Sequence, residues 1–116
     1  MTIRRIDAGP RMSAAVIHGN TVYLAGQVAR DAAGKSVAEQ TTNILAIIDG
    51  ILAKAGTDKS KLLNAFIWLS DISTFDEMNK VWDAWVSPGN TPARATVEAK
   101  LAAPQFKVEI GVIAAL

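Results

Sequence analysis

Two charged residues near the C-terminus, Arg94 and Glu109, are of the types that bind a carboxylate and accept a proton. Each lies in a short segment, 94–99 or 107–114, in which polar residues alternate with small or branched apolar ones. Such alternation is typical of a β-strand with one apolar side. The polar sides comprise Arg94, Thr96, Glu98, Lys107 and Glu109. We expect these residues to share one uncovered face of a sheet, where an arginine and a carboxylate meet.

Two interpretations of this pair remain open on the residues alone. The Arg94 guanidinium can hold a ligand carboxylate through two parallel hydrogen bonds. The Glu109 carboxylate, in a partly dry cleft, can accept a proton from an attacking water. The alternative is structural, with Arg94 paired to Glu98 or Glu109 and with Glu109 paired to Arg94 or a lysine.

The composition is that of one domain, residues 1–116, with enough apolar residues for a core. Half of the residues are hydrophobic, and twelve Lys and Arg against eleven Asp and Glu give a net charge of +1. This balance offers no basis for binding nucleic acid, whereas one arginine suffices for a small anion. The absence of cysteine excludes disulfides and thiol catalysis. The only histidine, His18, is expected to be exposed beside a turn, so no metal site is expected.

The sequence also carries no pattern for a membrane. No apolar run approaches the roughly 20 residues of a membrane-spanning helix. The first five residues lack the apolar core of a signal peptide. We therefore expect a cytoplasmic, soluble protein.

Three strands are predicted in addition to the two C-terminal ones. Residues 14–17 and 22–25 flank Gly19-Asn20, a pair that tolerates positive φ and favours a hairpin. Residues 62–69 are apolar, branched and aromatic over a length that suits a buried strand, so Trp68 is expected in the core.

Two helices are predicted, each opened by a capping box in which a hydroxyl and a carboxylate satisfy free backbone amides. The two boxes are Ser36 with Glu39 and Thr74 with Glu77. The first helix should end at about Ala55, before Gly56. The second should pack through an apolar stripe of Phe75, Met78, Val81, Trp82 and Trp85. The predicted order is ββαβαββ, an α+β fold with a mixed sheet and both helices on one face.

Several segments together resemble one known family. Pro92-Ala93-Arg94 opens a strand that continues Thr96-Val97-Glu98-Ala99, and Val108-Glu109-Ile110 follows. Residues 22–27, ending in Gly-Gln, and the helical runs 40–56 and 75–82 stand in matching order and spacing. This arrangement resembles the reactive-intermediate deaminase family, also called the RidA or YjgF family. The resemblance implies a chorismate-mutase-like fold and a homotrimer with ligand clefts between subunits.

The resemblance also implies roles for individual residues. Arg94 matches the carboxylate-binding arginine of the family, and Glu109 matches the glutamate near the reactive carbon. Further cleft positions fall on Met12, Ala25, Gly26, Asn79 and Thr96. Met12 stands where many members have tyrosine, and Thr96 where many have cysteine. From the residues alone, Asn79 fits a helix surface equally well, and the two small residues fit tight packing.

The activity implied is hydrolysis of reactive 2-imino acids or their enamine tautomers to 2-oxo acids and ammonia, with no cofactor. Arg94 would bind the substrate carboxylate, and Glu109 would assist the attacking water. The alternative is a non-catalytic trimer of the same fold that binds a small carboxylate as a sensor or interaction module. The substitutions at Met12 and Thr96 motivate this alternative.

Overall fold

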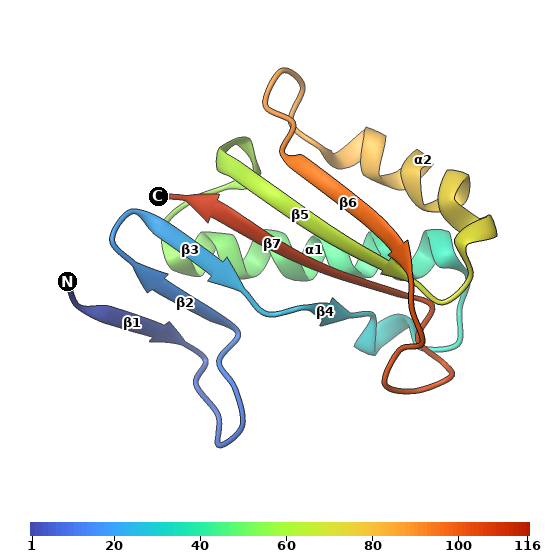
Figure 1. Cartoon of the computed structure of the whole chain (residues 1–116), viewed down its shortest axis with the longest axis horizontal. Helices are drawn as coiled ribbons and strands as arrows, with labels where there is room; N and C mark the ends of the chain where they lie inside the picture. Colours follow the sequence, from blue (N-terminus) through green and yellow to red (C-terminus); the bar gives the residue numbers. More distant parts are fainter.

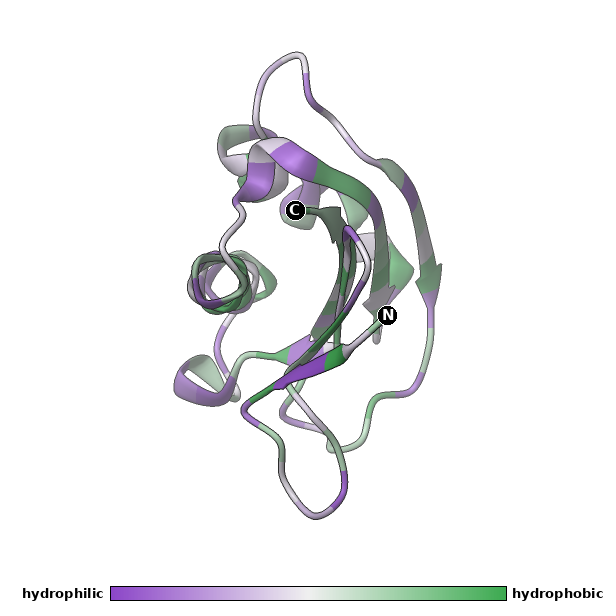
Figure 2. Ribbon diagram, turned by 90° about the vertical axis from the view of Figure 1, so that its left-hand side faces the viewer, coloured by the Kyte–Doolittle hydropathy of each residue, from purple (hydrophilic) through white to green (hydrophobic).

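A mixed β-sheet with two helices packed on one face makes up the structure, a computed structural model that describes residues 1–116 (Figures 1 and 2). The elements in chain order are β1 (Ile3–Ile6), β2 (Ala15–His18), β3 (Thr21–Leu24), β4 (Gln27–Val28), α1 (Val37–Ala55), β5 (Leu62–Leu69), α2 (Phe75–Trp85), β6 (Ala93–Glu98) and β7 (Val108–Ala115). The predicted α+β fold is confirmed, with both helices on the same side. No helix has the length and apolar character needed to cross a membrane.

The strands run in the spatial order β1-β2-β3-β7-β5-β6, and the short β4 also pairs with β7. Only β5 and β6 pair in parallel, while all other pairs are antiparallel. The C-terminal strand β7 is therefore central, and β6 forms an edge. The two C-terminal strands are not neighbours, because β5 lies between them.

The core lies between the sheet and α1. Alternate residues of β5 and β7 point toward the helices and are buried: Ala65, Ile67, Leu69, Val108, Ile110, Val112 and Ala114. Residues of α1 at helical spacing meet them and are also buried: Ile44, Leu45, Ile48 and Leu52. Each large side chain buried in this way stabilises the fold by about 1.5–3 kcal/mol relative to exposure.

The ends of α1 are as the sequence predicts. The Ser36 hydroxyl accepts a hydrogen bond from the Glu39 amide at 3.1 Å and donates to the Glu39 carboxylate at 3.2 Å. Gly56 ends the helix with φ of 86°, a left-handed conformation that favours glycine.

The capping box predicted for α2 is wrong. Thr74 closes a short 3-10 turn, residues 72–74, and its hydroxyl donates to the Asp71 carbonyl instead. The Glu77 carboxylate accepts from the Ala38 amide at 2.9 Å, at the beginning of α1. Glu77 thus links α2 to the beginning of α1. It does not form a capping box with Thr74, because the Thr74 hydroxyl is already bonded to the Asp71 carbonyl.

Two strands and one orientation were not predicted from the sequence. The edge strand β1 contains two arginines and only one buried residue, Ile6, and β4 has only two residues, so neither has a clear alternating pattern. Trp68, expected in the core, is half-buried on the face of the sheet away from the helices. It stacks there with Phe66, with ring centroids 6.2 Å apart.

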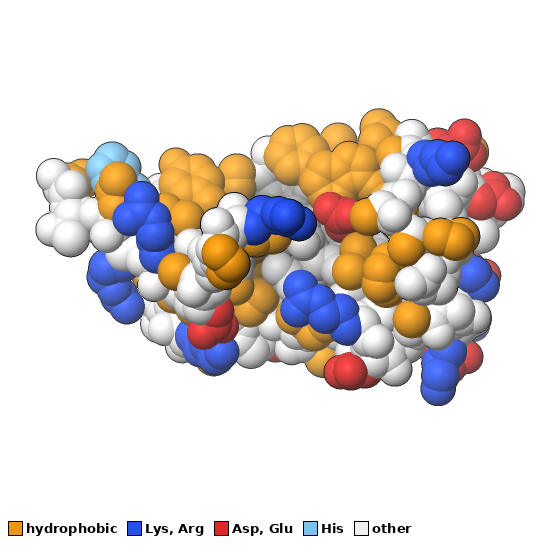
Figure 3. Space-filling model, turned by 90° about the horizontal axis from the view of Figure 1, so that it is seen from below, with side chains coloured by type: hydrophobic (Ala, Val, Ile, Leu, Met, Phe, Trp, Pro, Cys, Tyr) orange, Lys and Arg blue, Asp and Glu red, His pale blue; other side chains and the backbone are white.

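The face of the sheet away from the helices, hereafter the open face, is rich in apolar side chains. Hydrophobic groups crowd the upper edge of the molecule in Figure 3, where this face is seen in profile. Large hydrophobic residues of this face that remain exposed are Ile3, Tyr23, Phe66 and Val97. Exposed apolar patches of this kind are typical of protein interfaces.

Candidate functional site

Arg94 and Glu109 lie on opposite faces of the sheet. In the parallel β5–β6 pair, Arg94 is in register with Ala65, whose side chain is buried against the helices. Glu109 is in register with Trp68, so its side chain points to the open face. One strand, β5, also lies between β6 and β7.

The expectation that all five polar residues share the uncovered face is therefore wrong. Thr96 and Glu98 are in register with Ile67 and Leu69, and so lie with Arg94 on the helix side. The reason is the pairing of β6 with β5. Alternation determines which residues of a strand share a side, whereas strand pairing determines which side that is.

Arg94 is held under α2 without a counter-ion. Its guanidinium carbon lies 5.3 Å from the centroid of the Trp82 ring and 5.7 Å from that of Phe75. The side chain is half-buried and makes no hydrogen bond or ion pair. Burial lowers the pKa of the Arg94 guanidinium, and the negative charge of Asp83 opposes this effect. The group stays charged at neutral pH, so its donors are free for an anion.

Two further polar atoms at this place lack partners. The Asn79 Oδ1 and Thr96 Oγ1 atoms are buried and have no hydrogen bond. Asn79 lies on the same stripe of α2 as Phe75 and Trp82, and Thr96 follows Arg94 on the same side of β6. A buried polar group without a partner costs about 1–3 kcal/mol. We call these residues, Phe75, Asn79, Trp82, Arg94 and Thr96, the arginine half-site.

Glu109 also has no partner, on the other face. Its carboxylate makes no hydrogen bond or ion pair, and burial raises the pKa of the Glu109 carboxyl. A Cβ placed on Gly26 would come within 3.1 Å of the Glu109 Cδ and collide with its Oε2. A Cβ on Gly111 would lie 3.6 Å from the Trp68 ring and from the Gly26 backbone. Gly26, Trp68, Glu109 and Gly111 form what we call the glutamate half-site.

Ala25 and Gly26 link β3 to β4 beside this carboxylate. The Ala25 amide donates to the Ala14 carbonyl, and its own carbonyl accepts from the Gln27 side chain at 3.0 Å. The small residues at 25 and 26 thus lie where the chain passes close to Glu109. A larger side chain at 26 would occupy the space that the carboxylate takes.

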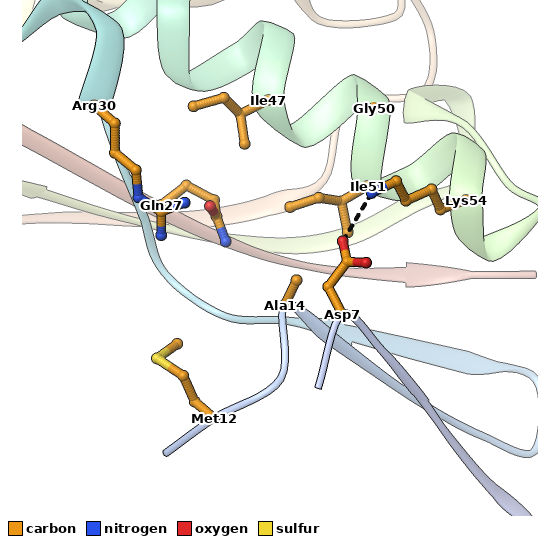
Figure 4. Close-up of a pocket in the computed structure, with 9 residues that line it drawn as sticks. All are labelled: Asp7, Met12, Ala14, Gln27, Arg30, Ile47, Gly50, Ile51 and Lys54. Carbon is orange, nitrogen blue, oxygen red and sulfur yellow. Dashed lines mark hydrogen bonds and ion pairs between the residues drawn. The ribbon is translucent and has the colours of Figure 1, made fainter. Parts of the chain in front are cut away.

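Met12 lies elsewhere, in the loop between β1 and β2. It is 55% exposed and lines a cavity of about 380 Å³ between this loop and α1 (Figure 4). The opposite wall carries Ile47 and Ile51 of α1, and an ion pair of 2.8 Å between Lys54 and Asp7 closes one end. Within one chain, Met12 is not part of either half-site.

The structure thus divides the predicted site residues into separate groups. Arg94, Asn79 and Thr96 come together under α2, while Gly26 and Glu109 come together on the open face. The sequence pattern predicts only a helix-packing role for Phe75 and Trp82. Their spacing of seven residues along α2 places both on the stripe that faces β6, but only the position of Arg94 reveals their contact with it. No three His, Asp or Glu side chains lie close enough together to hold a metal ion.

Comparison with known proteins gives the family of this fold. Residues 2–116 match the family described as Endoribonuclease L-PSP. The RutC family protein YoaB of Escherichia coli is 49% identical over 116 residues, which cover 100% of both chains. A RutC family protein of Haemophilus influenzae is 47% identical over 114 residues, 98% of each chain.

Solved structures agree with these matches. A YjgF family member from Neisseria meningitidis superposes with a TM-score of 0.95 at 48% identity, covering 99% of this chain and 95% of that one. A Rid family protein of unknown function from Yersinia pestis gives a TM-score of 0.85 at 29% identity, covering 94% and 90%. The protein belongs to the RutC/YjgF family, and the resemblance inferred from its motifs is confirmed.

Proposed function

We propose that this protein hydrolyses reactive 2-imino acids or their enamine tautomers to 2-oxo acids and ammonia, in sites shared between copies of the chain. The observation that carries the proposal is the pair of unpartnered groups, a free guanidinium on one face and a desolvated carboxylate on the other. Family membership supports this assignment but does not by itself specify the reaction.

The opposite placement of Arg94 and Glu109 has a geometric consequence. A single substrate cannot contact both residues of one chain, because the sheet lies between them. The two half-sites can serve one reaction only if the arginine half-site of one copy faces the glutamate half-site of another. A head-to-tail contact of this kind generates a ring when its rotation closes, and the apolar open face supplies a surface for it.

In such a site the two groups divide the chemistry. Arg94 binds the substrate carboxylate through two parallel hydrogen bonds and orients the imine carbon. Glu109 accepts a proton from water while the water oxygen bonds to that carbon, and the C=N electron pair moves to nitrogen. The protonated Glu109 then returns the proton to the amine nitrogen. Glu109 next accepts the proton of the new hydroxyl and passes it to the same nitrogen, so that the C–N bond breaks with ammonia as the leaving group and the C=O bond of the 2-oxo acid forms.

The raised pKa of Glu109 suits both steps. A carboxylate of ordinary pKa is a weak base, and one whose pKa lies closer to neutrality takes up and returns a proton more readily. Neither step requires a cofactor, since the imine carbon is already electrophilic. We do not propose RNA as the substrate, because a net charge of +1 attracts its phosphate backbone only weakly.

The direct test is ammonia release from an imine generated in solution from its amino acid, measured across aliphatic, aromatic and acidic side chains. We expect release well above the spontaneous rate for at least one class. Binding of the matching 2-oxo acid, measured by calorimetry, is expected in parallel. Binding without any increase in rate would contradict the enzyme and favour the non-catalytic carboxylate-binding protein.

The shared site also predicts the assembly. We expect a homotrimer in solution, measured by light scattering at micromolar concentration. A charged substitution at an exposed apolar residue of the open face, Val97→Asp, should weaken it. The same change at an exposed residue of α1, Ala53→Asp, serves as the control. A wild-type monomer at all concentrations would contradict the shared site.

Replacing Gly26 by alanine is expected to lower kcat about ten- to a hundredfold while the chain still folds. The added methyl group displaces the Glu109 carboxylate, which can swing away at little cost in stability, and small misplacements of a reacting group cost this much. Gly50→Ala in α1, where a Cβ meets nothing within 4 Å, is the matched control. Steady-state kinetics and thermal unfolding of both variants measure the effects on kcat and on stability. An unchanged kcat in Gly26→Ala would show that catalysis does not depend on the exact position of the Glu109 carboxylate.

A further inference from the structure

We infer that Phe75 and Trp82 are positioning residues, whose aromatic rings hold the Arg94 guanidinium in place with its hydrogen-bond donors unpaired. This inference rests on the proposed role of Arg94 in binding a carboxylate. It adds two residues of α2 whose side chains carry no charge and no acid–base chemistry.

The two rings replace the counter-ion that Arg94 lacks. Its guanidinium carbon lies within 6 Å of both ring centroids, at 5.3 Å and 5.7 Å. At this range a cation is attracted by the negative face of an aromatic ring. A half-buried arginine normally pairs with a carboxylate, yet neither Glu98 nor Asp83 lies within ion-pair distance. The attraction to the rings offsets part of the lost hydration without using any N–H group.

The rings are themselves held in place. Trp82 is 5% exposed and packs against Trp85, with ring centroids 5.4 Å apart. The Trp85 indole N–H donates to the Asp49 carboxylate of α1 at 3.0 Å. The ring of Trp82 that contacts Arg94 is therefore fixed, through Trp85, to α1, the longest helix of the fold.

Phe75 differs from an ordinary core residue. It lies at the first position of α2 and is 38% exposed, so its burial stabilises the fold less than that of a fully buried phenylalanine would. The Arg94 guanidinium lies over its ring, with 5.7 Å between the guanidinium carbon and the ring centroid. An exposed ring that contacts a free cation is explained better by a role at Arg94 than by packing.

The consequence for binding is preorganisation. A guanidinium engaged in an ion pair must break that pair before it binds a substrate, and a flexible guanidinium must lose conformational freedom. The contacts of the Arg94 guanidinium with the two rings use none of its N–H donors, so a carboxylate can bind without an ion pair being broken first. Phe75 and Trp82 should therefore act on carboxylate affinity and hence on KM, and much less on kcat.

The test combines a double-mutant cycle with a direct measurement of the contact between the Arg94 guanidinium and the rings. Phe75→Leu keeps apolar bulk but removes the ring, and Phe75→Tyr keeps the ring and should restore binding. We expect Phe75→Leu to weaken binding of 2-oxobutanoate, measured by calorimetry, about three- to tenfold. In an Arg94→Ala background the same change should have no effect on the residual affinity. Trp82→Phe, which retains a ring in the core, should resemble wild type.

Nuclear magnetic resonance of the Arg94 Nε–H group supplies the second readout. Ring currents should shift this proton upfield in the wild-type protein, and Phe75→Leu should reverse much of the shift. Arg94→Lys, which removes the signal, assigns it. An unshifted Arg94 signal, or a loss of affinity in Phe75→Leu that persists equally in the Arg94→Ala background, would overturn the inference. Failure of wild type to bind any 2-oxo acid of the aliphatic, aromatic and acidic classes would instead contradict the proposed function, while the Arg94 resonance would still test whether the rings contact the guanidinium.

Discussion

Replacing Arg94 by lysine is expected to lower kcat/KM for a 2-imino acid about ten- to over a hundredfold, with the fold retained. Lysine keeps the positive charge but not the planar pair of donors that matches a carboxylate. Its ammonium group also lacks the planar surface with which a guanidinium can stack on the rings of Phe75 and Trp82. The loss of a charge-assisted hydrogen bond to substrate costs about 1.5–3 kcal/mol, which corresponds to this range in rate.

The measurement is steady-state kinetics, with calorimetric binding of the 2-oxo acid product as the second readout. Arg4→Lys, an exposed arginine of β1, is the matched control and should behave as wild type. Circular dichroism and thermal unfolding establish that each variant folds. Wild-type efficiency in a folded Arg94→Lys protein would exclude Arg94 from substrate binding.

Replacing Glu109 by glutamine is expected to lower kcat about a hundredfold or more, while affinity for the 2-oxo acid changes little. Glutamine has the same shape but cannot accept a proton from water. Glu98→Gln is the matched control, because Glu98 lies on β6 and its carboxylate accepts from the Ile72 amide rather than facing the open face. Equal losses in kcat and in affinity would indicate that Glu109 only shapes the site.

The raised pKa of Glu109 gives this prediction a pH dependence. The carboxylate must be ionised to accept a proton, so kcat should fall as pH decreases through its raised pKa. In a plot of kcat against pH, this fall should occur at higher pH than the titration of an ordinary glutamate, and it should be absent in Glu109→Gln.

Ionisation of Glu109, which activity requires, should lower the stability of the fold. A carboxyl whose pKa is higher in the folded state than in the unfolded state binds its proton more tightly when folded. The ionised form therefore destabilises the fold above this raised pKa, and the effect vanishes below the pKa of the unfolded chain. Glu109→Gln should unfold at a higher temperature than wild type at neutral pH, and the difference should disappear in acid. Thermal unfolding at fixed protein concentration over this pH range tests the sign.

The helices and main strands could be predicted because local patterns determine them. Ser36 and Glu39 specify where α1 begins and Gly56 specifies where it ends, each through hydrogen bonds within a few residues of its own end of the helix. The strands 62–69 and 108–115 carry apolar residues that must be buried. The pattern failed at Thr74 and Glu77, because a carboxylate that could cap its own helix binds the neighbouring one instead.

The candidate site could be predicted in part. The motifs around Arg94 and Glu109 identify the residues, but local pattern does not say that β6 pairs with β5 and turns Arg94 away from Glu109. Strand pairing is a long-range property, and a parallel pair across a helix leaves no local signal. The contact of Phe75 with Arg94 is also a long-range property, since the two residues approach only through the packing of α2 on β6.

The central claim, that each site takes Arg94 from one copy and Glu109 from another, is tested most directly by mixing two inactive chains. Arg94→Ala and Glu109→Ala chains, each nearly inactive alone, are refolded together in equal amounts. Random assembly into a closed ring should restore about a quarter of wild-type activity, because one boundary in four then joins an intact Arg94 to an intact Glu109. As a control, wild-type chains mixed equally with the double variant should also retain about a quarter, whereas sites within single chains would retain about half. No recovery in the first mixture and half-activity in the second would contradict the shared site.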